Sequence, residues 1–310
     1  MIDIAHLKRL KLNPKPWGQQ LVATLLLFPN YHIFARVEIE LEGIEHIPRD
    51  ESVIFAMNHT DRFNYWPFQY QLRKLKVFRY STVWVKAKYY QNALLAKGLD
   101  LCNLIPVPTM GYLLQEFFQQ RMKRKMEKPE YRIFKDILDG KCDPGQFPQK
   151  VQETMALLGE SFVLHIRRYY DELMGHVAEL SRKALFEKQL NLIIFPEGTR
   201  SVTLGEGKSG LAQLALHTKK KVVPVGCNNS EEVYRGSWPF ARSGRIVYRI
   251  GEPLSPDNQL KECQIEEDFH PLSRESQERY RAQFELATKI IMERIDQLLD
   301  RRYRISASPV

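Results

Sequence analysis

The stretch Asn191-Leu-Ile-Ile-Phe-Pro-Glu-Gly-Thr-Arg-Ser201 decides the fold class. Residues 191–195 are mostly apolar and predict a short buried strand, which Pro196 ends. The polar residues 197–200 then lie in the turn that follows this strand. Because ligands of open α/β sheets bind at the ends of strands, we expect a ligand site in this turn. A capped surface turn is the alternative interpretation of so short a motif.

The four residues of this turn have complementary chemistry. Glu197 supplies a carboxylate, Gly198 exposes the backbone, Thr199 supplies a hydroxyl and Arg200 supplies a guanidinium. An arginine in such a place suits phosphate or carboxylate ligands, because its planar fork bonds two oxygens at once. The turn is therefore predicted to hold a polar or anionic group.

Other segments predict further strands with helices between them. Continuous apolar runs indicate buried strands, and alternating runs indicate half-exposed strands. The segments concerned are residues 37–41, 52–57, 81–85, 104–108, 222–226 and 245–250. Strands interleaved with helices predict an α/β fold, and we expect a mixed sheet flanked by helices.

We expect the chain to have two parts. Residues 1–35 are predicted to form N-terminal helices, and residues 36–310 are predicted to form the α/β domain. Residues 112–188 are mainly helical in character, so they are expected to be an insertion in that domain. Residues 273–303 predict one long amphipathic helix, because their apolar residues recur at the spacing of a helical stripe.

The N-terminal part is basic and contains a short apolar helix. Asp3 is the only acid in residues 1–36, and Pro14 and Pro16 separate a short basic helix from an apolar helix predicted at residues 17–28. Basic residues and aromatics around such a helix suit a segment that lies in a membrane interface. Packing of the helix on the protein core is the alternative. No apolar stretch approaches the roughly 18–20 residues that a spanning helix needs.

The charge of the chain favours an anionic partner. Its 310 residues carry a formal net charge of +9. Hydrophobic residues make up 44% and charged residues 27%, which indicates a globular protein. Anionic lipid, a phosphorylated substrate and nucleic acid are the candidate partners. Nucleic acid is the least favoured, because no recognised nucleic-acid motif accompanies the charge.

The four cysteines lie far apart in sequence and form no Cys-x-x-Cys pair and no metal-ligand spacing. They indicate reduced structural thiols, as in a cytosolic-type compartment. We therefore expect no metal site.

A second set of polar residues follows the strand predicted at residues 52–57, which delivers Asn58 and His59 at its end. A histidine at a strand end, beside the N-terminus of the next helix, is placed to act as a general base. A histidine that caps a turn is the alternative interpretation.

Together these residues resemble the glycerolipid acyltransferase superfamily, which includes bacterial lysophosphatidic acid acyltransferases. The matching segments are Asn58-His-Thr-Asp-Arg-Phe-Asn64 for the first motif, N-H-x-x-x-x-D, Phe195-Pro-Glu-Gly-Thr-Arg-Ser201 for the third, Lys208-Ser-Gly210 for the K-x-G after it, and Val222-Val-Pro-Val225 for the fourth. Their order and strand contexts agree with the family, and the resemblance spans most of residues 36–253. It implies a glycerolipid acyltransferase-like fold.

The resemblance also implies a mechanism. His59 would remove a proton from an acceptor hydroxyl, with Asn64 at the position of its orienting partner, and the oxygen would attack the thioester of acyl-CoA or acyl carrier protein. General-base help of this kind is typically worth about 10²–10⁴-fold. The acceptor would be bound by Glu197, Gly198, Thr199, Arg200 and Lys208.

No cofactor or metal is implied, because the acyl donor is a substrate. The implied partners are membrane lipids and the acyl donor, with no nucleic acid. The implied place is the cytoplasmic face of a membrane, with peripheral or monotopic attachment. Acyl chain length and oligomeric state are not indicated.

The chain departs from the family pattern at three places. Asn64 stands where the first motif has Asp, so the tautomer of His59 can be held by an amide oxygen but without a negative charge. Residues 104–111, at the place of the second motif, contain no arginine, and Lys86 and Lys88 are the candidate phosphate contacts instead. The insertion is expected to form a lid or a membrane-docking surface.

Three functions remain open at this point. The first is an O-acyltransferase for a glycerolipid, with lysophosphatidate as the family's usual acceptor. The second is an acyltransferase for a neutral lipid alcohol, because the second motif lacks its arginine. The third is a catalytically inactive lipid-binding or scaffold protein, because Asn64 replaces the motif Asp.

Overall fold

The computed structural model describes residues 3–141, 149–159 and 161–305. The chain divides into two compact units. The larger unit comprises Lys11–Trp84, Lys97–Ile105 and Ala178–Val310, and the smaller comprises Met1–Leu10, Val85–Ala96 and Pro106–Val177. Residues 11–35 thus belong to the larger unit, and most of the segment expected to be an insertion belongs to the smaller. The expected division of the chain at residue 35 stays a prediction.

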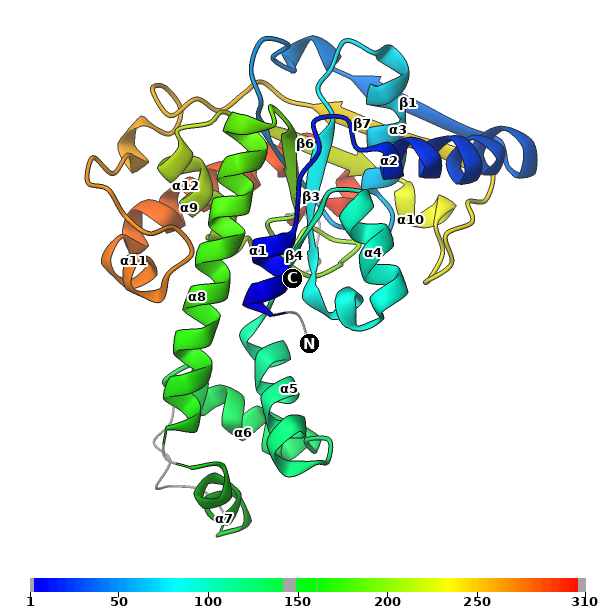
Figure 1. The fold of residues 1–310 in the computed structure, drawn as a ribbon. Helices are drawn as coiled ribbons and strands as arrows, with labels where there is room; N and C mark the ends of the chain where they lie inside the picture. Colours follow the sequence, from blue (N-terminus) through cyan, green and yellow to red (C-terminus); the bar gives the residue numbers. More distant parts are fainter. Residues whose placement is uncertain (1–2, 142–148, 160, 306–310) are drawn as a thin grey trace. The chain divides into compact units, whose positions relative to one another are not determined.

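A seven-stranded sheet forms the centre of the fold, in the order β1-β7-β6-β2-β5-β3-β4 (Figure 1). Its strands are β1 (Val37–Glu42), β2 (Ile54–Met57), β3 (Ser81–Lys86), β4 (Leu104–Val107), β5 (Asn191–Ile194), β6 (Val222–Asn228) and β7 (Gly244–Ile250). β6 and β7 pair antiparallel, whereas β2 pairs parallel with both β5 and β6. The predicted mixed sheet is confirmed.

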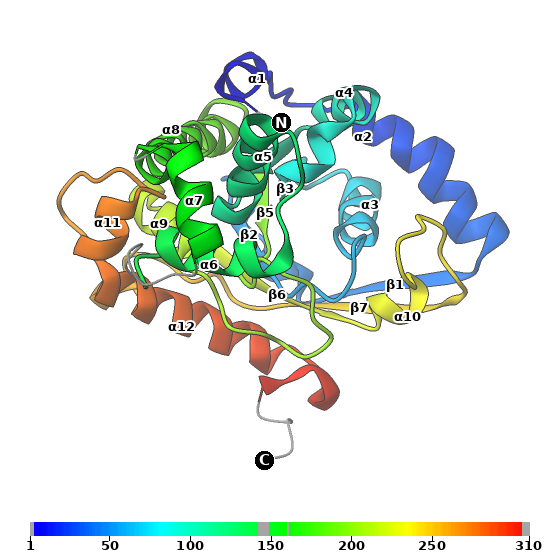
Figure 2. The ribbon, with the colours of Figure 1, turned by 90° about the horizontal axis from the view of Figure 1, so that it is seen from below.

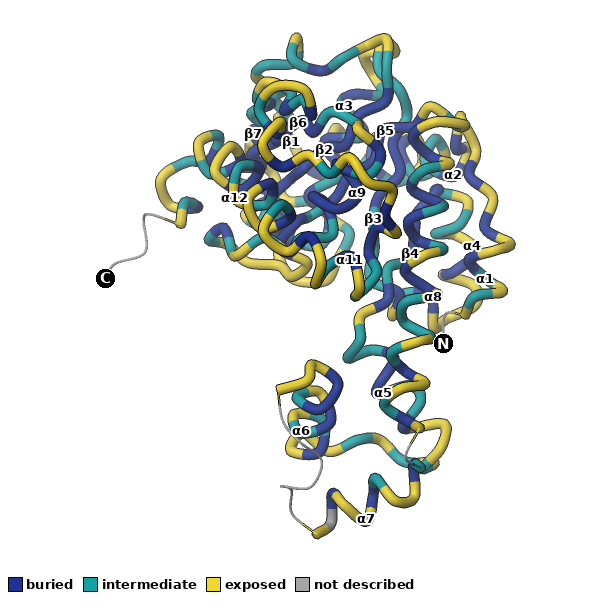
Figure 3. The backbone as a smooth tube through the Cα atoms, turned by 90° about the vertical axis from the view of Figure 1, so that its left-hand side faces the viewer, coloured by how far each residue is buried: buried dark blue, intermediate teal, exposed yellow. Residues whose placement is uncertain are grey.

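The central strands are buried along their whole length, as their sequences predict. Every residue of β2, β5 and β6 is buried, and these strands appear dark blue in Figure 3. A strand covered on both faces is expected to be a continuous apolar run rather than an alternating one. Helices supply the cover. In the larger unit, α3 (Tyr65–Leu75) lies on one face of the sheet, and α12 (Arg281–Gln297) lies on the other with α9 (Gly210–Thr218) (Figure 2).

The predicted single C-terminal helix is wrong in one respect. Tyr280 has φ −112° and ψ 29°, which is not helical, and it separates α11 (Arg274–Arg279) from α12. A short 3₁₀ turn, Arg301–Tyr303, follows α12. The apolar stripe itself is confirmed, because Phe284, Ala287, Ile291 and Ile295 are buried. The period of the apolar stripe does not reveal the break, because Tyr280 is buried and would be buried in one continuous helix as well.

The N-terminal segment forms two helical pieces, as the prolines predict. α1 (Ile4–Arg9) precedes them, and α2 (Trp17–Leu21) follows them and continues in π-helical turns at Val22–Leu27 and Asn30–Phe34. The helix thus runs farther than residue 28. One face is buried at Ala23, Leu27 and Tyr31, whereas side chains on the other face are exposed. In the described part of the chain, no helix is long and apolar enough to cross a membrane.

The smaller unit is helical, as predicted for most of this segment. It contains α1, a 3₁₀ turn at Ala87–Gln91, α5 (Met110–Met122), α6 (Lys128–Leu138), α7 (Gln149–Leu158) and the first part of α8 (Phe162–Arg182). The sequence predicts two helices in this region, at residues 151–173 and 176–189, and the predicted break between them is wrong. Gly175 lies within α8, where its missing side chain faces open space, so the glycine lowers helix propensity without ending the helix.

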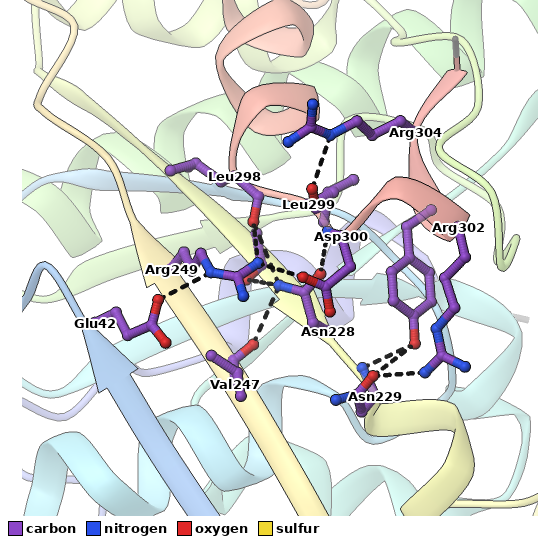
Figure 4. Close-up of polar contacts among 12 residues, drawn as sticks. Glu42, Asn228, Asn229, Val247, Arg249, Leu298, Leu299, Asp300, Arg302 and Arg304 are labelled. Carbon is purple, nitrogen blue, oxygen red and sulfur yellow. Dashed lines mark hydrogen bonds and ion pairs between the residues drawn. The ribbon is translucent and has the colours of Figure 1, made fainter. Parts of the chain in front are cut away.

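The chain after α12 is fastened to the ends of β6 and β7 (Figure 4). The buried side chain of Asn228 accepts a hydrogen bond of 2.8 Å from the backbone N–H of Asp300. Arg249 pairs with Glu42 at 2.9 Å and with Asp300 at 2.8 Å. The backbone oxygen of Tyr303 accepts from Leu204 N at 2.8 Å, so this chain end also holds the loop that follows the third motif.

Replacing Asn228 with alanine is expected to destabilise the fold. It removes the buried amide that accepts from Asp300 N, and leaving a buried polar group unsatisfied costs about 1–3 kcal/mol. Urea denaturation would measure the loss. Arg301→Ala, an exposed change in the neighbouring 3₁₀ turn, is the matched control and should stay within about 0.5 kcal/mol of the wild type. Equal stabilities for the two variants would contradict the anchoring role of Asn228.

Candidate active site

Two neighbouring strands deliver the two sets of polar residues. β2 ends at Met57 and is followed by Asn58 and His59, and β5 ends at Ile194 and is followed by the third motif. β2 and β5 pair parallel, with Ala56 opposite Ile194. Their carboxyl ends therefore lie at the same edge of the sheet, and the structure brings the first and third motifs together as the sequence predicts.

Asn58 anchors the first motif to the sheet. Its side-chain oxygen accepts from Cys227 N at 2.7 Å, and its side-chain nitrogen donates to Cys227 O at 3.0 Å. Asn58 is 2% exposed and Cys227, in β6, is fully buried. This pair of bonds fixes the residue that precedes His59.

The ring of His59 lies against the third motif. It stacks on the ring of Phe195, with centroids 4.1 Å apart and planes inclined by 18°. The backbone oxygen of His59 also accepts from Ser201 N at 2.9 Å. The stacking partner was not predicted, because nothing in the sequence distinguishes Phe195 from any other apolar residue at the end of a buried strand.

The side chain of Asn64 lies beside the ring of His59. His59 Nδ1 lies 3.3 Å from Asn64 Oδ1, at the long end of hydrogen-bond distances. Asn64 is fully buried, and its Nδ2 donates to Asn58 O at 2.7 Å. That bond orients the amide so that its oxygen faces the histidine. An acceptor at Nδ1 favours the tautomer with the proton on Nδ1 and the lone pair on Nε2.

The sequence also offers Asp61, two residues after His59, as a possible partner of the imidazole, but its carboxylate is engaged elsewhere. Its Oδ1 accepts from Phe63 N at 2.7 Å, and its Oδ2 accepts from the Thr60 hydroxyl at 3.1 Å. Asp61 is 6% exposed, and burial raises its pKa from 3.8 to about 6. It shapes the turn after His59 rather than orienting the imidazole.

Asp61 is expected to make the stability of the protein depend on pH. Because the pKa of Asp61 is higher in the folded state than in the unfolded state, the folded state holds this proton more tightly. The contribution of Asp61 to stability is therefore fully present below about pH 4 and is lost as pH rises through about 6. The shift of the pKa from 3.8 to about 6 corresponds to about 3 kcal/mol of unfolding free energy. Asn cannot ionise and can still accept from Phe63 N.

The stability of Asp61→Asn relative to the wild type should therefore rise by about 3 kcal/mol between about pH 4 and pH 7. Urea denaturation at several pH values measures this gap. A gap that stays constant over the range would contradict the effect of burial on Asp61.

Glu197 holds the two motifs together. Its Oε2 accepts from His59 N at 2.7 Å, and its Oε1 accepts from Gly205 N at 2.9 Å. The side chain is 3% exposed, and burial raises its pKa. The carboxylate thus fixes the backbone of the histidine and the loop after the third motif. Direct binding of the acceptor by Glu197 stays a prediction.

The rest of the turn is exposed and is closed by glycine. Gly198 donates its N–H to Phe195 O at 3.1 Å and has φ +67°, a conformation that favours glycine. Thr199 and Arg200 are exposed. Lys208 is also exposed, and its backbone N–H donates to Pro196 O at 2.7 Å.

The turn and the lysine are therefore neighbours. A Cβ placed on Gly198 would lie 3.8 Å from Lys208 Cγ. No ion pair between described residues involves the side chain of Arg200 or of Lys208. The two cations are thus available to an anionic group. Lys86 and Lys88 belong to the smaller unit, and their role as phosphate contacts stays a prediction.

Residues 3–141, 149–159 and 161–305 contain no group of three or more His, Cys, Asp or Glu that could hold a metal ion. The side chains of the described site offer an imidazole, an amide oxygen, a buried carboxylate and two exposed cations.

Comparison with known proteins adds to this geometry. A family model described as Acyltransferase matches residues 149–228. A 1-acyl-sn-glycerol-3-phosphate acyltransferase from Cocos nucifera is 31% identical over 109 residues, which cover 33% of this chain and 35% of that protein. Residues 149–228 of the chain are thus similar to the Acyltransferase family.

The similarity covers a limited part of the chain. The family match contains the third and fourth motifs and does not reach His59, so the first motif rests on its sequence and its geometry. The matched region covers about a third of the coconut relative. The crystal structure of the 1-acyl-sn-glycerophosphate (LPA) acyltransferase PlsC from Thermotoga maritima aligns with a TM-score of 0.40 and 15% identity, over 93% of this chain and 79% of that chain.

Proposed function

We propose that the chain is an O-acyltransferase that moves a fatty acyl group from acyl-CoA or acyl carrier protein to the hydroxyl of a glycerolipid. The observation that carries the proposal is the position of His59, whose Nδ1 faces Asn64 Oδ1 while its ring stacks on the third motif. This arrangement favours a lone pair on Nε2, which a general base requires. The similarity of residues 149–228 to the Acyltransferase family supports the reaction class.

In the proposed reaction, His59 Nε2 takes the proton of the acceptor hydroxyl as the oxygen attacks the thioester carbonyl. The C–S bond then breaks, and the thiol of the donor leaves with the proton that His59 returns. The products are an ester and a free thiol, so no acyl-enzyme is needed. Asn64 would orient the imidazole, and Glu197 would hold the His59 backbone through the bond of 2.7 Å.

The proposed acceptor is lysophosphatidate. Arg200 and Lys208 are exposed cations beside the turn at Gly198, and a phosphate there would accept several charge-assisted hydrogen bonds. The printed name of the coconut relative contains the same phosphorylated glycerol, which supports this choice. A neutral lipid alcohol is the second candidate acceptor, because residues 104–111 contain no arginine.

The proposed location is the cytoplasmic face of a membrane, with peripheral attachment through the N-terminal segment. Four apolar side chains on its helix, Trp17, Leu21, Leu25 and Phe28, are 46–71% exposed. They follow one another at steps of three or four residues, so they form one stripe on a helix. An exposed apolar stripe in a basic segment is typical of a helix that lies in the interface.

A transfer assay tests the proposal. Purified protein would be given labelled acyl-CoA or acyl carrier protein, with lysophosphatidate or monoacylglycerol as acceptor. We expect transfer to lysophosphatidate in preference to monoacylglycerol. Equal rates with the two acceptors would contradict the phosphate role of Arg200 and Lys208. No transfer from either donor to any acceptor would support the inactive lipid-binding protein instead.

A further inference from the structure

The loop between α10 (Ser230–Val233) and β7 exposes two large aromatic side chains. Trp238 is 73% exposed and Phe240 is 56% exposed. Single apolar residues on a surface are ordinary, but two aromatics within three positions of one loop form a local apolar projection. Trp is also enriched where proteins meet the headgroup region of a membrane.

The loop is held in place by the N-terminal segment. Asn30 donates its side-chain N–H to Pro239 O and accepts from Ala241 N through its side-chain oxygen, both at 3.0 Å. Asn30 is 1% exposed, so both atoms of a buried amide serve this loop. Two bonds on either side of Phe240 fix the backbone that presents this side chain and Trp238.

The base of the loop is fastened as well. Arg242 N donates to Val233 O at 2.9 Å, and Arg36 N donates to the Ser243 hydroxyl at 3.1 Å. Gly236 has φ +76°, which turns the chain where a side chain would be strained. These contacts hold the loop in one conformation, and in this conformation its two aromatic side chains are exposed.

The aromatics of the loop extend the apolar surface of the N-terminal segment. Asn30 lies among Phe28, Ile33 and Phe34, which are 51%, 68% and 77% exposed. Because Asn30 is bonded to the residues on both sides of Phe240, the two sets of exposed side chains are neighbours in the fold. Figure 1 and Figure 2 show the loop before β7 beside the end of the N-terminal helix.

The charges around the loop are positive. Arg36, Arg235 and Arg242 are exposed, and residues 235–243 contain no acid. Within the described part of the chain, none of these three side chains makes an ion pair. The acids that precede the loop are already engaged, since Glu231 accepts from the Tyr303 hydroxyl at 2.6 Å and Glu232 pairs with Arg302.

We propose that residues 235–243 form a second membrane-contacting element, in which Trp238 and Phe240 enter the interface and the flanking arginines contact anionic headgroups. Exposed aromatics with free cations match an anionic lipid surface, which offers both an apolar boundary and negative charge. This inference rests on the proposed membrane attachment and is independent of acyl transfer. Asn30 is the positioning residue that joins this loop to the N-terminal helix.

Vesicle binding by the full chain tests the proposal. Flotation would use vesicles of phosphatidylcholine alone and vesicles that also contain phosphatidylglycerol. Trp238→Ser with Phe240→Ser should weaken binding to both kinds by about tenfold or more. Arg235→Ser with Arg242→Ser should weaken binding only to the anionic vesicles, by about tenfold or more at low salt. Quenching of tryptophan fluorescence by lipids with brominated acyl chains should be smaller in Trp238→Phe than in the wild type.

Matched controls remove residues of the same kind elsewhere in the larger unit. Phe186→Ser with Leu286→Ser removes two exposed apolar side chains, and Lys289→Ser with Arg294→Ser removes two exposed cations of α12. Both control variants should bind as the wild type does. If the loop variants bind as tightly as these controls, and quenching does not change, the loop proposal is wrong while membrane attachment stands. A wild type that binds neither kind of vesicle overturns both.

Discussion

Replacing His59 with alanine is expected to lower the rate of acyl transfer by about 10²–10⁴-fold. The substitution removes the imidazole proposed as the general base at the edge shared by β2 and β5. The ring is half-buried and stacks on Phe195, so its loss opens a shallow space at the surface rather than a cavity in the core. The fold should therefore persist.

Initial rates with labelled acyl donor measure this effect, and thermal unfolding reports on the fold. His46→Ala is the matched control, because His46 is also half-buried and its Nδ1 lies 2.8 Å from a backbone oxygen, that of Ile250. His46 lies after β1, away from both motifs in the chain, and its loss should leave the rate within about twofold. A His59→Ala protein that keeps the wild-type rate would show that this histidine is not the base.

The sequence predicts the core of this site for a simple physical reason. Two apolar runs must become buried strands, and polar residues directly after them must come out at a sheet edge. β2 and β5 pair parallel and adjacent, so His59 and Glu197 meet. The order and spacing of the motifs at residues 58–64 and 195–201 give the resemblance to the acyltransferase family.

Other features depend on contacts between residues that are distant in the chain. The bonds of Asn228 to Asp300 and of Asn30 to the loop before β7 join segments whose partners no local pattern identifies. The break at Tyr280 is similar, because an amphipathic stripe has the same period whether one helix or two carry it. Such contacts satisfy buried backbone groups, and that requirement appears only when the fold is known.

Replacing Asn64 with leucine is expected to lower kcat by about 10²–10³-fold. This is less than the loss of about 10⁴-fold in a serine protease when Asn replaces the Asp that orients the catalytic His and the wrong tautomer is held. Leucine has nearly the shape of Asn but offers no acceptor to His59 Nδ1, so the ring is no longer held in the required tautomer. It also leaves Asn58 O without its donor of 2.7 Å, and a buried unsatisfied oxygen costs about 1–3 kcal/mol of stability. Both the rate and the unfolding midpoint should therefore fall.

Aspartate at the same position separates the two roles of Asn64. Asn64→Asp keeps an acceptor for Nδ1 and adds a negative charge that stabilises the imidazolium formed in the reaction, so kcat should be retained or raised. The new oxygen would face Asn58 O in a site that is fully buried, so stability should fall. A rate that is kept or raised, together with a lower stability, is thus the expected result, measured as kcat and as the midpoint of thermal unfolding. If Asn64→Leu transferred acyl groups as fast as the wild type, the amide would serve the fold alone, and His59 would be oriented by its stacking on Phe195.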